Sequence, residues 1–300
     1  MKYLFYSSVN IDVVFKVDHI VLPGETQSSY GVSTGAGGKG ANQSAAFAKA
    51  IGTSCAPSVN QVYLAGKCAV DANFILEKLN RFGVNTSFMQ PSSSGTGKAF
   101  IQVDSKGQNS IILYGGGNQN IERQEVDKVL EAFSDKDVLF VNCEINNLGY
   151  LINQAYMKGM KIIVNPSPIN SAIEEIDFSK VSAMIVNEVE GARLSGLEEK
   201  ADYEAILRVL SEKWPHCEIV MTVGEQGAYY SFGGKCVKVP AVKTTVVDTT
   251  AAGDTFMGYF FSSRLNGFSV EVALQRAARA SALTVSRPGA MDSIPFGNEV

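Results

Sequence analysis

The 300-residue sequence has only two histidines, His19 and His216, and none of its five cysteines form a C-x-x-C pair. The two histidines are far apart in the chain and match no ligand pattern, which argues against a zinc site or a Ser-His-Asp triad. An odd number of cysteines is typical of reduced thiols rather than of a disulfide framework. Runs of like charge, internal repeats and low-complexity tracts are also missing, and the net charge is -4. We therefore expect no nucleic-acid-binding surface or tail.

Long apolar runs are missing as well. No stretch is long enough to span a bilayer, and the apolar start of the chain turns polar at Ser7-Ser8, too early for a signal-peptide core. We therefore expect a cytoplasmic protein that makes no contact with membranes. Hydrophobic residues make up 45% of the chain and there are 28 glycines, which is typical of a globular, enzyme-like protein with many tight turns. The length suits one large α/β domain or two smaller ones.

From residue 137 onward, apolar strands alternate regularly with helical segments. The expected strands are 138–142, 161–165, 183–187 and 218–223, and the expected helices lie near 147–158, 188–195, 202–214, 254–265 and 269–284. Strands separated by helices predict a doubly wound α/β fold, in which a mostly parallel sheet has helices on both faces. Ligands of such sheets bind at the carboxyl ends of the strands. Five polar residues are expected at or just past those ends: Glu144, Asn165, Asn187, Thr222 and Asp248.

The N-terminal part of the chain predicts a second, smaller sheet. Residues from about 13 to 36 form short alternating segments broken by Pro23-Gly24, which suggests an antiparallel layer. Residues from about 96 to 116 resemble a hairpin around Lys106-Gly107. We expect these two regions to lie side by side as one small sheet. The polar segment 53–61 is expected to be a loop.

A glycine loop opens an alanine-rich helix in the first quarter of the chain. The loop, Gly35 to Gly40, lacks the Walker A spacing because Lys39 is followed by glycine. Lys39 and Asn42 lie on the first turns of the helix and indicate recognition of a polar ligand. Upstream, Asn10 and Asp12 are two residues apart in an extended segment, so their side chains would point to the same side. Turn formation is the alternative there, since both residue types favour turns.

A second small-residue segment, Ala251-Ala252-Gly253, separates the β-branched stretch 243–247, an expected strand, from an apolar helix. The unpaired N–H groups of a helix N-terminus can hold an anion, and small side chains let a phosphate approach them closely. Asp254 is poorly suited to bind an anion there, but it could take the proton of a hydroxyl that attacks the phosphate. The alternative is an ordinary capped helix with Asp254 stabilising its first turn.

Two further segments could contact a nucleotide and its metal. Asn187 and Glu190 are three residues apart at a helix start, so both could face a hydrated Mg²⁺. The equally good alternative is a helix cap with an acidic residue in the first turn. The segment Thr222–Gly227 follows a strand and has two glycines. It could lie against the phosphates or adenine of a nucleotide, or it could be a tight turn.

From the first strand to about Pro295, the chain resembles the PfkB-type (ribokinase-like) sugar kinases. The resemblance rests on Gly37-Gly38-Lys39-Gly40-Ala41-Asn42-Gln43 followed by Asp248-Thr249-Thr250-Ala251-Ala252-Gly253-Asp254-Thr255-Phe256. Together with Asn10-Ile11-Asp12, the first motif looks more like the ribose-specific branch than the adenosine or phosphofructose branches. The resemblance implies one ribokinase-like domain over residues 1–300, with the small sheet as a lid, that phosphorylates D-ribose at O5 with ATP. A different small sugar or a nucleoside as substrate, and a non-catalytic sugar-binding regulator, are the alternatives.

The resemblance also implies a role for each matching position. The base would be Asp254, with an anion hole from the amides of Ala251, Ala252 and Gly253. The sugar-binding residues would be Asn10, Asp12, Gly38, Lys39, Asn42 and Glu144. The residues for ATP and Mg²⁺ would be Asn187, Glu190, Thr222, Gly224, Glu225 and Gly227. Those near an activating K⁺ would be Asp248, Thr250, Thr284, Arg287, Gly289 and Ser293. The lid would also join two copies as a homodimer. Ala278 departs from the family pattern, which often has an adenine-contacting histidine there.

Overall fold

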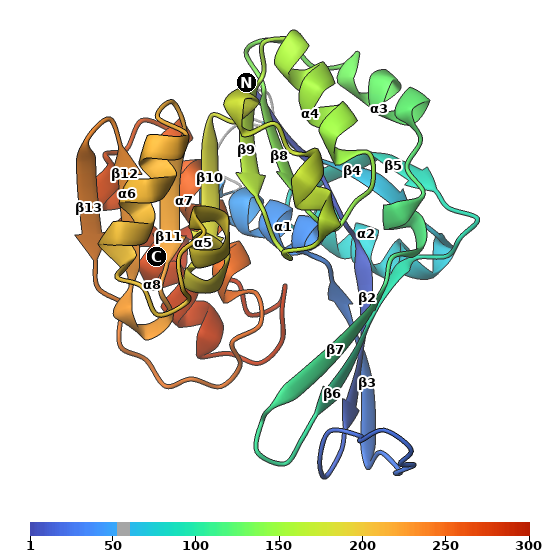
Figure 1. The fold of residues 1–300 in the computed structure, drawn as a ribbon. Helices are drawn as coiled ribbons and strands as arrows, with labels where there is room; N and C mark the ends of the chain where they lie inside the picture. The colour runs from blue at the N-terminus through green and yellow to red at the C-terminus, as the bar shows by residue number, and fades with distance from the viewer. Residues whose placement is uncertain (53–60) are drawn as a thin grey trace.

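The computed structural model describes residues 1–52 and 61–300, so the loop expected at 53–61 lies, except for Gln61, outside the described residues. Figure 1 shows a large sheet flanked by helices and a small sheet that projects away from it. The large sheet has the order β13-β12-β11-β10-β9-β8-β1-β4-β5. Its strands are β1 (Lys2–Tyr6), β4 (Gln61–Cys68), β5 (Val84–Pro91), β8 (Val138–Asn142), β9 (Lys161–Asn165), β10 (Ala183–Asn187), β11 (Glu218–Thr222), β12 (Ala228–Phe232) and β13 (Lys235–Val239).

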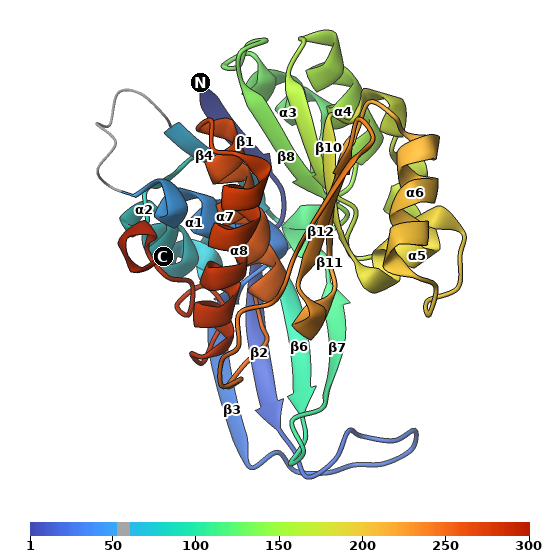
Figure 2. The ribbon, with the colours of Figure 1, turned by 90° about the vertical axis from the view of Figure 1, so that its left-hand side faces the viewer.

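The strands from β11 to β5 pair in parallel, and only the edge strands β12 and β13 are antiparallel. The predicted mostly parallel sheet is therefore confirmed. Helices cover both faces, as Figure 2 shows. The α-helices are α1 (Lys39–Ile51), α2 (Asn73–Arg81), α3 (Arg123–Leu130), α4 (Leu148–Met157), α5 (Glu188–Ser195), α6 (Tyr203–Lys213), α7 (Ala252–Leu265) and α8 (Val270–Val285). Short 3₁₀ turns are η1 (Val70–Ala72), η2 (Gly116–Gln119), η3 (Ser171–Glu175), η4 (Phe178–Lys180), η5 (Gly224–Gln226) and η6 (Gly297–Glu299).

Two apolar cores lie on opposite faces of the large sheet. Phe5 joins one core, with residues of α1, α2, α7 and α8, while its neighbour Leu4 joins the other, with residues of α3 to α6. This alternation follows from the period of two in a strand, and it explains why the middle residues of the buried strands form a continuous apolar run. In the first core Phe5 stacks on Phe140 at 4.3 Å between ring centroids, and Phe47 of α1 packs on both rings. These aromatic contacts fix α1 against the centre of the sheet.

The small sheet has the strand order β3-β2-β6-β7, with β2 (Asn10–Lys16), β3 (Gly31–Gly37), β6 (Gly97–Val103) and β7 (Asn109–Tyr114). The expected hairpin forms β6 and β7, and β2 pairs antiparallel with β3. The antiparallel layer expected from residues 13–36 is therefore confirmed, and the two regions join through a parallel pairing of β2 with β6. The long crossover between them permits this pairing, since β2 and β6 come from distant parts of the sequence.

The stretch 243–247, expected as a strand before Ala251, is irregular. The large sheet ends at β13, so this β-branched run has no strand to pair with. Val246 and Val247 are 61% and 58% exposed, and the amides of Val247 and Asp248 both donate to the carbonyl of Val285 at the end of α8. The segment leading into α7 is therefore held by a helix end. Among the described residues, no helix is long and apolar enough to cross a membrane.

Candidate active site

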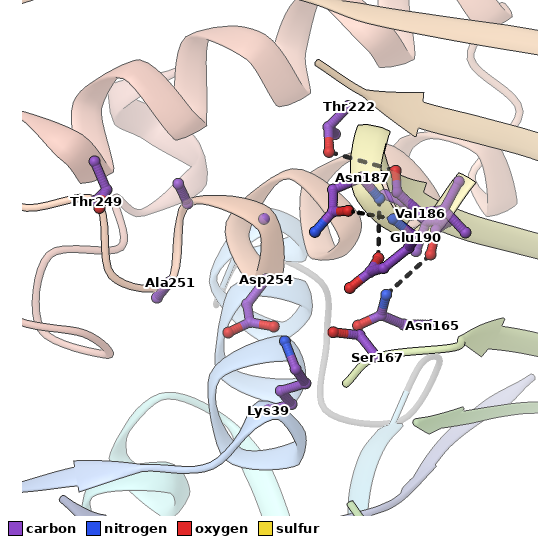
Figure 3. A pocket seen from close by; sticks show the side chains of 13 residues that line it. Lys39, Asn165, Ser167, Val186, Asn187, Glu190, Thr222, Thr249, Ala251 and Asp254 are labelled. Carbon is purple, nitrogen blue, oxygen red and sulfur yellow. Dashed lines mark hydrogen bonds between the residues drawn. The ribbon is translucent and has the colours of Figure 1, made fainter. Parts of the chain in front are cut away.

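A pocket of about 270 Å³ opens at the carboxyl ends of the central strands, between β9–β11 and the start of α7 (Figure 3). Strand ends contribute Asn165, Asn187 and Thr222, as the alternation of strands and helices predicts. The opposite wall comes from α1 and the start of α7. The remaining lining residues are Lys39, Ser167, Ile185, Val186, Glu190, Thr249, Ala251, Ala252, Gly253 and Asp254.

The N-terminus of α7 faces this pocket without a side-chain cap. Ala251 precedes the helix in the left-handed conformation, at φ 62°, and its carbonyl accepts the amide of Thr255 at 2.8 Å. No described residue accepts a hydrogen bond from the amides of Gly253 or Asp254. A Cβ added at Gly253 would meet no atom within 4 Å, so the backbone is open on that side. Open, unpaired amides at a helix N-terminus make a suitable anion site.

The carboxylate of Asp254 is held by two amide side chains of α1. Asn42 donates through Nδ2 to Oδ2 at 3.2 Å, and Gln43 donates through Nε2 to Oδ1 at 2.9 Å. The ammonium of Lys39 lies next to Asp254 in Figure 3. Burial lowers the pKa of Lys39, but the nearby Asp254 and Glu144 outweigh this effect and raise the pKa above its ordinary value. The pocket thus keeps a lysine cation beside a carboxylate at neutral pH.

Asp12 points from β2 toward the same carboxylates. Its pKa is raised to about 7, first by burial and then by the negative charges of Glu144 and Asp254. The close approach of β3 makes room for it only because residue 37 is glycine: a Cβ at Gly37 would lie 2.1 Å from the Asp12 carboxylate oxygens. Asp12 therefore titrates near neutral pH, inside a cluster of three acidic groups.

Asn10 lies two residues before Asp12 in β2 and is almost completely buried. Its Oδ1 accepts from Nδ2 of Asn118 at 2.7 Å, and Asn118 also bonds both backbone groups of Val9. A Cβ at Gly97 would lie 2.2 Å from both amide side chains. The start of the small sheet is thus locked to the segment after β7, and the Asn10 side chain is fixed in one orientation.

Glu144 joins the loop after β8 to the start of α1. Its carboxylate accepts the hydroxyl of Ser8, and its Oε2 accepts the Lys39 amide at 3.2 Å. Burial raises the pKa of Glu144, while the charge of Lys39 opposes that rise. Gly38, at φ 94°, forms the N-cap of α1, and a Cβ there would lie 2.8 Å from the amide of Asn10. The glycine loop therefore brings the Lys39, Glu144 and Asn10 segments into contact.

On the nucleotide side, Asn187 and Glu190 form a reciprocal helix cap. The Asn187 amide donates to Glu190 Oε2 at 2.9 Å, and the Glu190 amide donates to Asn187 Oδ1 at 2.8 Å. The capping alternative is thus what the structure shows, yet both residues also line the pocket. Gly224 and Glu225 lie in the exposed turn η5 and do not line it. Gly227, at φ 105°, has a structural reason to be glycine, because a Cβ would lie 2.0 Å from the carbonyl of Val239.

Of the positions expected near a monovalent cation, Thr250 and Gly289 bond Asp248 directly. Its Oδ1 accepts the amide and hydroxyl of Thr250, and its Oδ2 accepts the amide of Gly289 at 2.9 Å. Burial raises the pKa of Asp248, but these hydrogen bonds outweigh it and hold the pKa below its ordinary value. The other three positions have partners of their own. Thr284 bonds the hydroxyl of Thr255 at 3.0 Å, Arg287 bonds Glu299 at 2.7 Å, and Ser293 bonds the carbonyl of Ala290 at 2.7 Å.

Residues 2–296 match the family model described as pfkB family carbohydrate kinase. The chain belongs to the pfkB family of carbohydrate kinases. A curated relative, the ribokinase of Schizosaccharomyces pombe, is 33% identical over 306 residues, which cover 98% of this chain and 94% of that protein. The structure resembles that of the Cryptococcus neoformans ribokinase in complex with ADP, with a TM-score of 0.84, 33% identity and coverage of 99% and 98% of the two chains. It also resembles Arabidopsis thaliana ribokinase complexed with ribose and ATP, with a TM-score of 0.82, 26% identity and coverage of 99% and 96%.

The site of this pfkB-family kinase includes residues to which the sequence alone gave no role. Gln43 directly follows Asn42 in the first motif, but the motif does not reveal that the Gln43 side chain reaches Asp254. Asn118 follows three glycines, a pattern that indicates only a turn. Asn165 is foreseeable as a polar residue at a strand end, whereas its link to Gln43 depends on how α1 packs on the sheet. Each of these contacts joins segments more than 100 residues apart.

Proposed function

We propose that this protein catalyses the ATP-dependent phosphorylation of D-ribose at its O5 hydroxyl. The observation that carries the proposal is the position of Asp254, a half-buried carboxylate held by two side-chain amides at the N-terminus of α7, where the backbone amides of Gly253 and Asp254 are unpaired among the described residues. A base and an anion-binding backbone then meet at one point, which is what phosphoryl transfer to a hydroxyl requires. The ribokinase names of the relatives, and the ribose and ATP bound to one of them, support the choice of sugar.

The sugar would lie among the polar groups next to Asp254. These are the side chains of Asn10, Asp12, Lys39, Asn42 and Glu144 and the backbone of Gly38. Oδ1 of Asn42 is buried and has no partner among the described residues, so it is free to accept a hydrogen bond from a sugar hydroxyl. A set of buried donors and acceptors favours a polyol, because a substrate lacking a hydroxyl would leave one of them unpaired.

In the reaction, Asp254 takes the proton of the O5 hydroxyl as the oxygen attacks the terminal phosphorus of ATP. The amides of Ala251, Ala252 and Gly253 then hold the negative charge on the transferred phosphoryl group, and ADP leaves. The Lys39 ammonium, whose pKa is raised, adds a fixed positive charge beside Asp254. Positioning and charge stabilisation of this kind account for most of the catalysis in phosphoryl transfer.

The nucleotide would extend from the anion site toward Asn187, Thr222 and the turn of Gly224, Glu225 and Gly227. Glu190 uses Oε2 for the helix cap, and its Oε1 has no hydrogen bond from any described residue. This fits Mg²⁺, which keeps most of its waters and needs few protein oxygens besides the phosphates. Bound there, Mg²⁺ would neutralise charge on the phosphates.

We also propose that a K⁺ ion binds beside Asp248, held by Thr250, Thr284, Arg287, Gly289 and Ser293. The carbonyl oxygens of Thr250, Arg287 and Gly289 accept no hydrogen bond from the described part of the chain. Free carbonyls and one carboxylate suit a large, weakly hydrated cation. Because Asp248 lies in the segment that leads into α7, the ion would steady the amides that hold the phosphoryl group.

The whole chain, residues 1–300, would act as one cytoplasmic kinase domain, with the small sheet, from about 13–36 and 96–116, as its lid and dimer contact. The strands of the lid expose several large apolar side chains: Val32, Phe100, Ile111, Ile112, Leu113 and Tyr114. An apolar surface of this kind on a soluble protein is typical of an interface. A second copy of the chain would cover it.

The test is a coupled assay of ADP release over a panel of pentoses, 2-deoxyribose, hexoses and nucleosides, with the product position read by ³¹P NMR. We expect the highest kcat/KM with D-ribose and a 5-phosphate product. A higher kcat/KM with another sugar or with adenosine would contradict the choice of substrate. Sugar binding without any ADP release would instead indicate a non-catalytic sugar-binding regulator.

A further inference from the structure

Three side chains form a continuous hydrogen-bonded path from the large sheet to Asp254. Nδ2 of Asn165 donates to the backbone carbonyl of Ile185 at 2.9 Å. Oδ1 of Asn165 lies 3.0 Å from Nε2 of Gln43, and the same nitrogen lies 2.9 Å from Oδ1 of Asp254. Gln43 is 1% exposed and Asn165 9% exposed. The Gln43 amide is therefore shielded from water, although Asp254 itself faces the pocket, and each link depends on the one before it.

The first link decides the orientation of both amides. A backbone carbonyl can only accept, so Asn165 must turn its NH₂ group toward Ile185 and its oxygen toward Gln43. An amide oxygen can also only accept, so Gln43 must present its own NH₂ group. The two hydrogens of that group serve the two acceptors, Asn165 Oδ1 and Asp254 Oδ1. The sheet thus determines that Gln43 is a donor to Asp254 and cannot become an acceptor by a flip of its amide.

We propose that Gln43 is a positioning residue that holds Oδ1 of Asp254 and so assigns proton uptake to Oδ2. This inference rests on the proposed function. Because the Gln43 N–H points at Oδ1, a proton on that oxygen would be repelled by the hydrogen of the donor. Among the described residues, Oδ2 accepts only the longer, 3.2 Å hydrogen bond from Asn42, so it is the better place for a proton. In the step, the sugar O–H bond breaks and its proton goes to Oδ2. The sugar oxygen forms the new bond to phosphorus, and the bond from phosphorus to the ADP oxygen breaks.

The first test replaces the donor and keeps the volume of the side chain, as in Gln43→Met. A hydrogen bond to a charged group is lost, so we expect kcat to fall about 10- to 100-fold. The KM for ribose and the ribose affinity measured by calorimetry should stay nearly unchanged, because the proposal gives Gln43 no contact with the sugar. The matched control is Ser44→Ala, since the Ser44 hydroxyl bonds only Ala41 within α1. This control should keep kcat. A Gln43→Met enzyme with wild-type kcat would overturn the proposal.

A double-mutant cycle with Asp254→Asn separates positioning from general damage to the fold. If Gln43 acts only through Asp254, adding Gln43→Met to Asp254→Asn should cost no further kcat. An equal loss in both backgrounds would overturn the proposal, although the proposed function would stand. Gln43→Leu serves as a second variant if the methionine protein does not fold: it has a similar size and also lacks the NH₂ group, so the same loss and the same absence of additivity are expected. A near-normal kcat in Asp254→Asn alone would refute the proposed function itself.

Discussion

Gly37→Ala should disable sugar binding through a single added methyl group. Gly37 ends β3 beside β2, and the new Cβ would lie 2.1 Å from both carboxylate oxygens of Asp12 and 2.3 Å from its Cγ. Non-bonded carbon and oxygen atoms in proteins do not approach each other so closely, so either the new methyl group or the Asp12 carboxylate must move. The ladder between β2 and β3 holds both backbones, and therefore we expect the Asp12 carboxylate to swing away from Glu144 and Asp254.

The size of the effect follows from the interactions that Asp12 would lose. Hydrogen bonds to a charged group are worth about 1.5–3 kcal/mol, which corresponds to a rise of about 10- to 100-fold in the KM for ribose. The kcat at saturating ribose should change little, because Asp254 and α7 are not touched. The overpacked site should also lower the free energy of unfolding by about 1–3 kcal/mol.

The assay is ADP release against ribose concentration, with thermal melting measured in parallel. Gly35→Ala is the matched control, because Gly35 lies in the same strand, pairs with Asp12 in register, and has no atom within 4 Å of the added Cβ. The control should retain the wild-type KM. A wild-type KM in Gly37→Ala, or an equal rise in Gly35→Ala, would refute the assignment of Asp12 to the sugar.

Four further predictions follow from the charges and surfaces of the molecule. The KM for ribose should fall as the pH rises through about 7, where Asp12 ionises, and Asp12→Asn should remove this dependence. The pKa of Asp12 is raised above its unfolded value near 3.8, so the free energy of unfolding of the ligand-free protein should fall as the pH rises from that value to about 7. Asp12→Asn should remove this fall. A variant whose free energy of unfolding falls with pH in parallel with the wild-type curve would contradict the prediction. Activity should rise when K⁺ replaces Na⁺ at fixed ionic strength, and Asp248→Ala should abolish the rise; equal rates in both salts would leave the 284–293 segment a structural turn. Ile112→Lys places a charge on an exposed apolar strand and should shift a dimer to a monomer in sedimentation velocity, and a monomeric wild-type protein would show that the lid is not the interface.

The parts of the fold that were predictable are those with a strong local pattern. β8, β9 and β10 have the predicted bounds because each is a short, uniformly apolar run between helices. The edge strands β5 and β13, and β12 beside β13, were not predicted, because each mixes polar residues with apolar ones and so resembles a loop. The stretch 243–247 was wrongly expected to be a strand, since β-branched residues favour an extended chain but cannot supply a neighbouring strand.

The site was predictable to the extent that its residues lie in compact motifs. Lys39 and Asn42 are on the first turn of α1, and Asp254 is on the first turn of α7, as the glycine and small-residue loops indicated. The contacts of Gln43 with Asn165 and of Asn10 with Asn118 depend on how distant elements pack, and no local pattern specifies them. At Gly227 the sequence suggested a nucleotide contact, but the nearby carbonyl of Val239 already explains why this residue is glycine, without any ligand.

The measurement that tests the central claim most directly is the turnover of Asp254→Asn beside its affinity for ribose. The asparagine keeps the size of the side chain and removes its basicity. The account predicts that kcat for ADP release falls about 10²- to 10⁴-fold, while calorimetry gives a ribose affinity close to that of the wild-type protein. A variant that binds ribose normally and turns over at nearly the wild-type rate would show that Asp254 is not the base.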